Sequence, residues 1–86
     1  MTTYRIELRP AAARALWKLE PAIRPRIQGA IALIADDRRP PASRPLRGRL
    51  GCRVRVGDYR IIYTIADDVL LNAVVAPGHR REIYDP

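Results

Sequence analysis

The sequence predicts an α+β fold in which a helical hairpin packs on one face of a mostly antiparallel four-stranded sheet, in the order β-α-α-β-β-β. Two observations carry this prediction. Apolar residues recur at helical spacing in the first part of the chain, and three segments of strand-like composition follow position 51. With 86 residues, the chain is expected to form one domain, residues 1–86, with room for two helices and one sheet but not for a deep pocket.

The first part of the chain reads as a strand followed by two helices. Residues 3–8 alternate weakly between apolar and polar side chains, which is typical of an edge strand. Pro10 suits the first turn of a helix, where its missing N–H is not needed, and this helix is expected to span residues 10–19. A second helix is expected over residues 21–35. Because it contains an early proline, its regular part should begin near Arg24.

The second part of the chain reads as a loop followed by three strands. Residues 36–45 contain adjacent prolines and no periodicity, which predicts a loop. Residues 52–56 alternate, and residues 59–65 are rich in β-branched and aromatic side chains. Residues 69–76 are almost wholly apolar, which favours an interior strand covered on both faces. Residues 79–84 are expected to form a short extended tail.

The positive charge is concentrated in one stretch. The chain has 16 Lys and Arg against 9 Asp and Glu, a net charge of +7, and residues 38–60 hold eight arginines and one acid, Asp58. This stretch therefore carries the whole net charge of the protein. Such a concentrated positive field attracts phosphates or an acidic protein.

Gly57 and Asp58 form the expected turn of a hairpin between the strands at 52–56 and 59–65. Glycine at the first central position predicts a two-residue type II′ turn, and this turn determines the register of the two strands. The expected cross-strand pairs are Val56 with Tyr59, Arg55 with Arg60, Val54 with Ile61, Arg53 with Ile62, and Cys52 with Tyr63.

This register places Arg53, Arg55 and Arg60 on one face of the sheet and the apolar side chains on the other. Two like charges directly opposite one another destabilise a sheet by up to about 1 kcal/mol. A local rule broken in this way tends to mark a functional site. The alternative interpretation is a solvated arginine face that reflects a GC-rich codon bias.

The run RVRVGDYRIIY, followed by GHRREIY, resembles the C-terminal half of RelE-type toxins of the RelE/ParE superfamily. The resemblance covers essentially the whole chain, but its specific motifs lie in residues 46–84. It implies a RelE-like fold and a metal-independent endoribonuclease that enters the ribosomal A site, cuts mRNA and stops translation without a cofactor. It also implies a co-expressed antitoxin that neutralises the toxin.

The resemblance also implies site residues. A basic pair on the first hairpin strand falls on Arg53 and Arg55, the Tyr-Arg step places a third catalytic arginine at Arg60, and the late positions fall on Arg80 and Tyr84. The better-known enterobacterial members carry Lys at the basic pair. Arginine stays protonated, so here this pair can stabilise charge but is not expected to accept a proton. The candidate proton acceptors are His79, whose ordinary pKa is near 6.5, and Tyr84.

We also expect further basic residues to bind nucleic acid, and we expect protein and DNA partners. Three arginines are expected either to contact the RNA backbone or to be solvated: Arg44, Arg47 and Arg49. Arg81 is assigned with them to nucleic-acid binding. We expect an acidic antitoxin whose amphipathic helix or extended segment lies over the helical hairpin or the basic face. Operator DNA is expected as a partner only of the toxin–antitoxin complex. No signal peptide is expected, because no basic region followed by an apolar run opens the sequence, and with no apolar stretch of membrane-spanning length the chain is expected to be cytoplasmic.

Two other functions compete with this interpretation. The ParE branch of the same superfamily poisons DNA gyrase and is not a nuclease. A third possibility is a catalytically inactive module that only binds its antitoxin and operator DNA. Translation and supercoiling assays separate the first two, and an Arg60→Ala, Arg80→Ala double variant tests whether the chain is a toxin at all.

Overall fold

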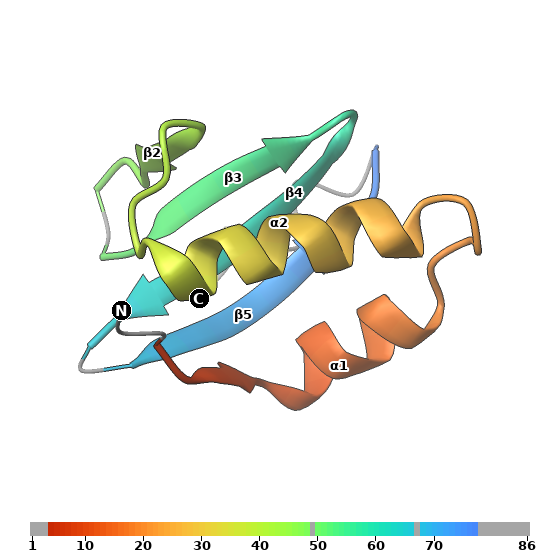
Figure 1. The fold of residues 1–86 in the computed structure, drawn as a ribbon, viewed down its shortest axis with the longest axis horizontal. Helices are drawn as coiled ribbons and strands as arrows, with labels where there is room; N and C mark the ends of the chain where they lie inside the picture. Colours follow the sequence, from red (N-terminus) through yellow and green to blue (C-terminus); the bar gives the residue numbers. More distant parts are fainter. Residues whose placement is uncertain (1–3, 49, 67, 78–86) are drawn as a thin grey trace.

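A computed structural model describes residues 4–48, 50–66 and 68–77. Two helices form one layer and a five-stranded sheet forms the other (Figure 1). In chain order the elements are β1 (Ile6–Leu8), α1 (Pro10–Trp17), α2 (Arg24–Asp36), β2 (Ser43–Pro45), β3 (Cys52–Val56), β4 (Tyr59–Ile65) and β5 (Val69–Val75). The expected α+β class, with a helical hairpin on one face of a mostly antiparallel sheet, is confirmed.

The strands lie in the order β1-β5-β4-β3-β2, with β1 parallel to β5 and every other neighbour antiparallel. The prediction of four strands was therefore one too low. The additional strand, β2, lies at the end of the segment that was predicted to be a loop. It is three residues long and pairs only with β3, at an edge of the sheet, where a proline costs no ladder hydrogen bond.

The hairpin formed by β3 and β4 has the predicted register. All five expected pairs are present, from Cys52 with Tyr63 to Val56 with Tyr59. Gly57 has φ +60°, and no described residue other than glycine has a positive φ. A type I′ turn would require a positive φ at Asp58 as well, so this geometry confirms the type II′ turn.

The two helices meet close to where the sequence placed them. α2 begins at Arg24, as expected, whereas α1 ends at Trp17, two residues before the predicted boundary. The Arg24 guanidinium lies at this end of α1, where its Nη2 donates to the carbonyl oxygens of Trp17 (2.9 Å) and Leu19 (3.1 Å). The Trp17 carbonyl is one of those that the end of α1 leaves without a partner inside the helix, and Arg24 satisfies it. Neither helix in the described ranges is long and apolar enough to cross a membrane.

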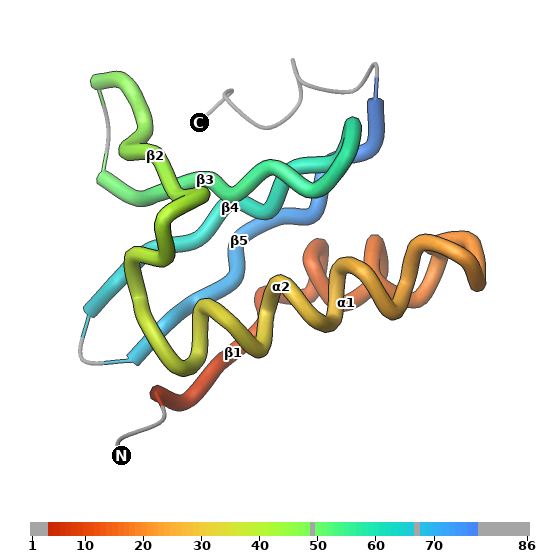
Figure 2. Tube along the Cα trace, turned by 45° about the horizontal axis from the view of Figure 1, so that its top comes forward, coloured from red at the N-terminus to blue at the C-terminus, as the bar shows by residue number. Residues whose placement is uncertain are grey.

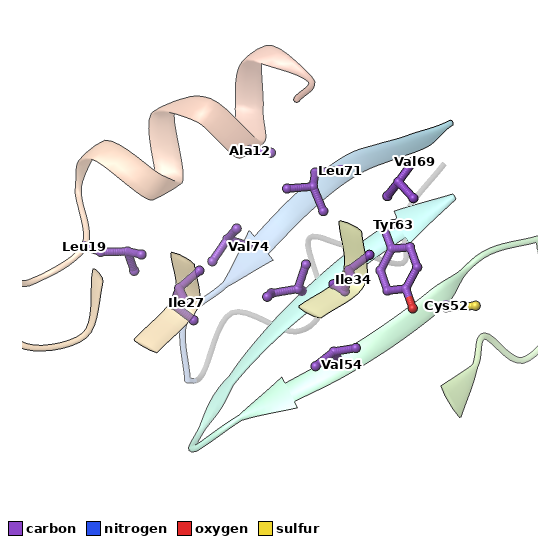
Figure 3. Close-up of a cluster of buried hydrophobic side chains, with 11 residues drawn as sticks. Ala12, Leu19, Ile27, Ile34, Cys52, Val54, Tyr63, Val69, Leu71 and Val74 are labelled. Atoms are coloured by element: carbon purple, nitrogen blue, oxygen red, sulfur yellow. The ribbon is translucent and has the colours of Figure 1, made fainter. Parts of the chain in front are cut away.

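The core fills the space between the helices and one face of the sheet (Figure 3). Ile27 and Ile34 of α2 are fully buried in one cluster with Ile61 and Tyr63 of the central strand β4 and Leu71 of the neighbouring β5. Figure 2 shows both helices on the same side of the sheet. Within the described ranges, the opposite face of the sheet therefore carries no helix.

A β-bulge interrupts β5. Ile62 pairs with Ala73 but the next residue, Tyr63, pairs with Leu71, so Asn72 is an extra residue in the ladder. The bulge lets Leu71 and Val74 both face the helices although they are three positions apart. The strand predicted over residues 69–76 did not include this interruption.

Tyr63 joins the core to the segment after α2. Its ring is fully buried, and its hydroxyl donates a 2.7 Å hydrogen bond to the carbonyl oxygen of Arg38. The Arg38 guanidinium in turn lies 4.3 Å above the centre of the Tyr4 ring. Burial, aided by the neighbouring Cys52, raises the pKa of Tyr63 to about 12.

This raised pKa predicts a loss of stability in alkali. Because the folded pKa lies above the unfolded value of 10, the contribution of Tyr63 is complete below pH 10 and is lost between pH 10 and about 12. The free energy of unfolding should fall by about 2–3 kcal/mol over this window. Urea unfolding at several pH values measures it, with Tyr63→Phe as the control, which should lose this component of the pH dependence. Equal slopes for the two proteins would contradict the assignment.

Candidate nucleic-acid interface

The sheet face opposite the helices carries four arginines, and we call it the arginine face. Arg53 and Arg55 alternate with the buried residues of β3, and their register partners Arg44 on β2 and Arg60 on β4 lie on the same side. Arg44, Arg53 and Arg55 are exposed, whereas Arg60 is half-buried. The structure therefore brings together the three hairpin arginines that the sequence singled out, and it adds Arg44.

The arginine face contains two like-charged cross-strand pairs, Arg55 with Arg60 and Arg44 with Arg53. The other register partners on this face are apolar: Ile62 lies opposite Arg53, and Val75 lies opposite Arg60. Neighbouring strands lie about 4.8 Å apart, so the arginines of each pair leave the sheet side by side. Among the described residues, no acid stands opposite any of these four arginines in the register, so the register itself supplies no counter-charge.

A small apolar cluster forms the floor between these arginines. It consists of Leu46, Ile62 and Val75, with Ala73 packed against it, and it is separate from the main core. An apolar surface beneath a charged group lowers the local dielectric constant and strengthens the attraction between a guanidinium and a phosphate. This floor did not emerge from the sequence, because Ile62 and Val75 read only as parts of apolar strands.

Of the other residues that the sequence predicted for the site, two lie in the part of the chain that the structure describes, and the rest do not. The Nη1 atom of Arg44 donates to the carbonyl oxygens of Ser43 (2.8 Å) and Pro41 (3.1 Å), which holds this guanidinium against its own loop. Arg47 is exposed in the turn that follows β2. The other predicted residues lie outside the described residues, and their place in the site stays a prediction: Arg49, His79, Arg80, Arg81 and Tyr84.

The Arg55–Arg60 pair predicts a conflict between stability and function. Arg55→Thr removes one of the two facing charges and supplies a residue that favours strands, so the free energy of unfolding should rise by up to about 1 kcal/mol. Urea unfolding at low and at high salt measures the change. The electrostatic part should shrink at high salt, where repulsion between exposed charges is screened. A destabilised variant would show that the arginine pair supports the fold.

Comparison with known proteins adds the family. The model of the family described as "ParE toxin of type II toxin-antitoxin system, parDE" matches residues 6–84. The chain belongs to the ParE toxin family. It is thus a type II toxin of the RelE/ParE superfamily, as the motifs in its C-terminal half implied. No curated protein matches the chain.

Solved structures support the same fold for this ParE-family chain. It is 26% identical to a chain of the RelBE2 toxin–antitoxin complex from Mycobacterium tuberculosis, with a TM-score of 0.74, covering 87% of this chain and 99% of that one. A chain of the archaeal RelE–RelB complex from Pyrococcus horikoshii is 24% identical (TM-score 0.72; 90% and 98% covered). The isolated E. coli RelE toxin is 20% identical (TM-score 0.77; 86% and 84% covered). For the P. horikoshii and E. coli chains, which are less than 25% identical to this one, the likeness establishes the fold alone.

Proposed function

We propose that this toxin is a RelE-type endoribonuclease that cuts mRNA on the ribosome and is held inactive by a cognate acidic antitoxin. The observation that carries the proposal is the arginine face, where Arg55 lies opposite Arg60 and Arg53 lies opposite Arg44. These charges oppose folding unless an anion lies between them. A phosphodiester in RNA is an anion whose oxygens match the geometry of guanidinium forks.

The reaction that suits these groups needs no metal. The ribose 2′ oxygen attacks the adjacent phosphorus, the bond from phosphorus to the 5′ oxygen of the next nucleotide breaks, and a 2′,3′-cyclic phosphate and a free 5′ hydroxyl remain. A base removes the 2′ proton and an acid protonates the leaving 5′ oxygen. Arg53, Arg55 and Arg60 stabilise the charge that builds up on the phosphate oxygens, a form of catalysis that depends on fixed, correctly placed donors.

The proton transfers require a different kind of residue. Arginine remains protonated at neutral pH and cannot act as the base. We assign the acid and base roles to His79 and Tyr84, and a further phosphate contact to Arg80. An imidazole with an ordinary pKa near 6.5 exchanges protons readily at neutral pH. In this proposal the ribosome supplies the geometry of the substrate, since a chain of 86 residues is not expected to form a deep site of its own.

The positive charge of the chain also supports the proposal of an acidic antitoxin. The similar M. tuberculosis structure is a toxin–antitoxin complex, and the similar P. horikoshii structure is a RelE–RelB complex. The net charge of +7 on this chain calls for an acidic partner that covers either the arginine face or the helical hairpin. Operator DNA is bound by the toxin–antitoxin complex.

A second candidate function is inhibition of DNA gyrase. The observation that favours it is the family match, because the matching model describes ParE toxins. We rank this function second because the arginine face and the sequence motifs together supply the groups that RNA cleavage needs.

Two assays of the purified chain separate the candidates. One follows cleavage of an mRNA in a reconstituted translation system, and the other follows DNA supercoiling by gyrase. The nuclease proposal expects ribosome-dependent cleavage and undisturbed supercoiling. Inhibited supercoiling with intact mRNA would replace it by the gyrase function. Activity in neither assay would support a module that only binds its antitoxin and DNA.

A further inference from the structure

An asparagine in the β5 bulge holds an arginine that the motifs do not include. The Asn72 side chain uses both ends of its amide: Nδ2 donates to Thr64 Oγ1 at 2.6 Å, and Oδ1 accepts from Arg9 Nε at 2.8 Å. Since a bulge redirects the side chain of its extra residue, Asn72 can bridge a strand in the middle of the sheet and a residue at its edge. Arg9 is thereby tied to the sheet through a chain of two hydrogen bonds.

The geometry places the Arg9 guanidinium on the arginine face. Thr64 follows Tyr63, whose ring points into the core, so the Thr64 hydroxyl lies on the opposite face of the sheet. The amide of Asn72 reaches that hydroxyl, and Arg9 Nε reaches the amide. The backbone also fixes Arg9 here, because its N–H donates to the carbonyl oxygen of Leu71 at 2.9 Å.

The surroundings of Arg9 suit an external anion. The Arg9 side chain is exposed. Among the described residues, its guanidinium makes one hydrogen bond, from Nε to Asn72 Oδ1. α1 begins at the next residue, and its first turn has no acidic residue and no side-chain cap. The N-terminus of a helix carries a partial positive charge, which adds to the attraction for an anion. Glu7, also on this side of β1, partly offsets it.

We infer that Arg9, positioned by Asn72 and Thr64, is a fifth guanidinium of the arginine face and binds a backbone phosphate of the RNA strand. The inference rests on the proposed function and deepens it. In the register, Arg44, Arg53, Ile62 and Ala73 lie directly opposite one another on β2, β3, β4 and β5, a row about 14 Å long. Arg9 extends this row at the β1 edge, so the RNA crosses the sheet roughly perpendicular to its strands.

The experiment measures binding without cleavage. A short single-stranded RNA with 2′-O-methyl groups lacks the attacking hydroxyl, and fluorescence anisotropy at several salt concentrations gives its Kd. Arg9→Gln should weaken binding several-fold at low salt and reduce the slope of log Kd against log salt by about 0.7, the value for one phosphate on a single strand. Arg14→Gln is the matched control: it removes the same charge from the exposed side of α1, and its slope should equal that of the wild type.

Asn72 is tested as a positioning residue by a double-mutant cycle. Asn72→Ala should weaken RNA binding in the wild-type background and have no further effect in Arg9→Gln, because it acts through that guanidinium. Thermal midpoints of all variants check the fold. Equal salt slopes for Arg9→Gln and Arg14→Gln would overturn the inference, as would additive effects of Arg9→Gln and Asn72→Ala, or a wild type that does not bind the RNA.

The inference and the proposed function fail separately. If the wild type cleaves mRNA on ribosomes while Arg9→Gln leaves the slope of log Kd against log salt unchanged, the nuclease proposal is supported and the Arg9 contact is contradicted. If the chain binds RNA with the expected loss of slope in Arg9→Gln but cleaves no mRNA, the Arg9 contact stands and the nuclease proposal falls.

Discussion

Arg60→Ala should reduce mRNA cleavage by about 100- to 1,000-fold, the usual effect of removing one fixed donor from a developing oxyanion. Arg60 lies opposite Arg55 and beside Val75 of the apolar floor, and it is the one half-buried arginine of the arginine face. A half-buried guanidinium is better fixed and less screened by water than its exposed neighbours. Single-turnover cleavage on programmed ribosomes measures the effect.

Two further variants test whether the loss of cleavage in Arg60→Ala comes from the missing guanidinium rather than from a change in charge. Arg60→Lys keeps the charge but loses the planar fork, so its rate should lie between those of the wild type and Arg60→Ala. Arg14→Ala removes one charge from α1 and should leave the rate near that of the wild type. Because Arg60→Ala also relieves the repulsion from Arg55, its urea midpoint should not fall. An inactive Arg60→Ala protein that is also unfolded would not support a catalytic role.

Gly51→Ala should cost about 2–4 kcal/mol of the free energy of unfolding, the largest stability effect expected of a single methyl group in this chain. Gly51 has φ +120°, and a Cβ atom there would lie 2.8 Å from the backbone oxygen of Tyr63 and 3.1 Å from Leu46 Cδ1. The backbone oxygen belongs to β4 and cannot move without disturbing the ladder. Urea unfolding followed by circular dichroism at neutral pH measures the loss.

The other glycines provide graded controls for this prediction. Gly48 also has a positive φ, +66°, but an added Cβ would meet no atom within 4 Å, so Gly48→Ala should cost only about 1 kcal/mol. Gly29 lies in α2 with open space around it, and Gly29→Ala should stabilise the protein by about 0.5–1 kcal/mol. Equal losses for Gly51→Ala and Gly48→Ala would contradict the role assigned to the close approach of Tyr63.

The hairpin could be predicted residue by residue, whereas at the sheet edges the sequence predicted the edge strand β1 but neither its partner nor the strand β2. A two-residue turn with glycine first leaves one register for β3 and β4, so local chemistry was sufficient. β1 and β2 are three residues long, and their pairing with β5 and β3 depends on tertiary contacts that short segments do not encode. The Arg24 guanidinium that donates to the end of α1 comes from the next helix, and no local signal in the sequence indicated this contact.

The site shows the same division. Alternation along β3 and the register of the hairpin are enough to place Arg53, Arg55 and Arg60 on one face. The apolar floor and the Arg9–Asn72 contact were missed, because both depend on how β5 lies against its neighbours. The one available signal was a lone asparagine within an apolar strand, and it marked a bulge.

The chemistry of the RNA ends is the most direct test of the central claim. Ribosomes translating a defined mRNA are treated with the wild type or with Arg60→Ala, and the new ends are mapped and their terminal groups identified. The account expects 3′ fragments that begin with a 5′ hydroxyl and 5′ fragments that end in a 2′,3′-cyclic phosphate, from the wild type only. Fragments ending in a 3′ hydroxyl, or identical cleavage by Arg60→Ala, would contradict it.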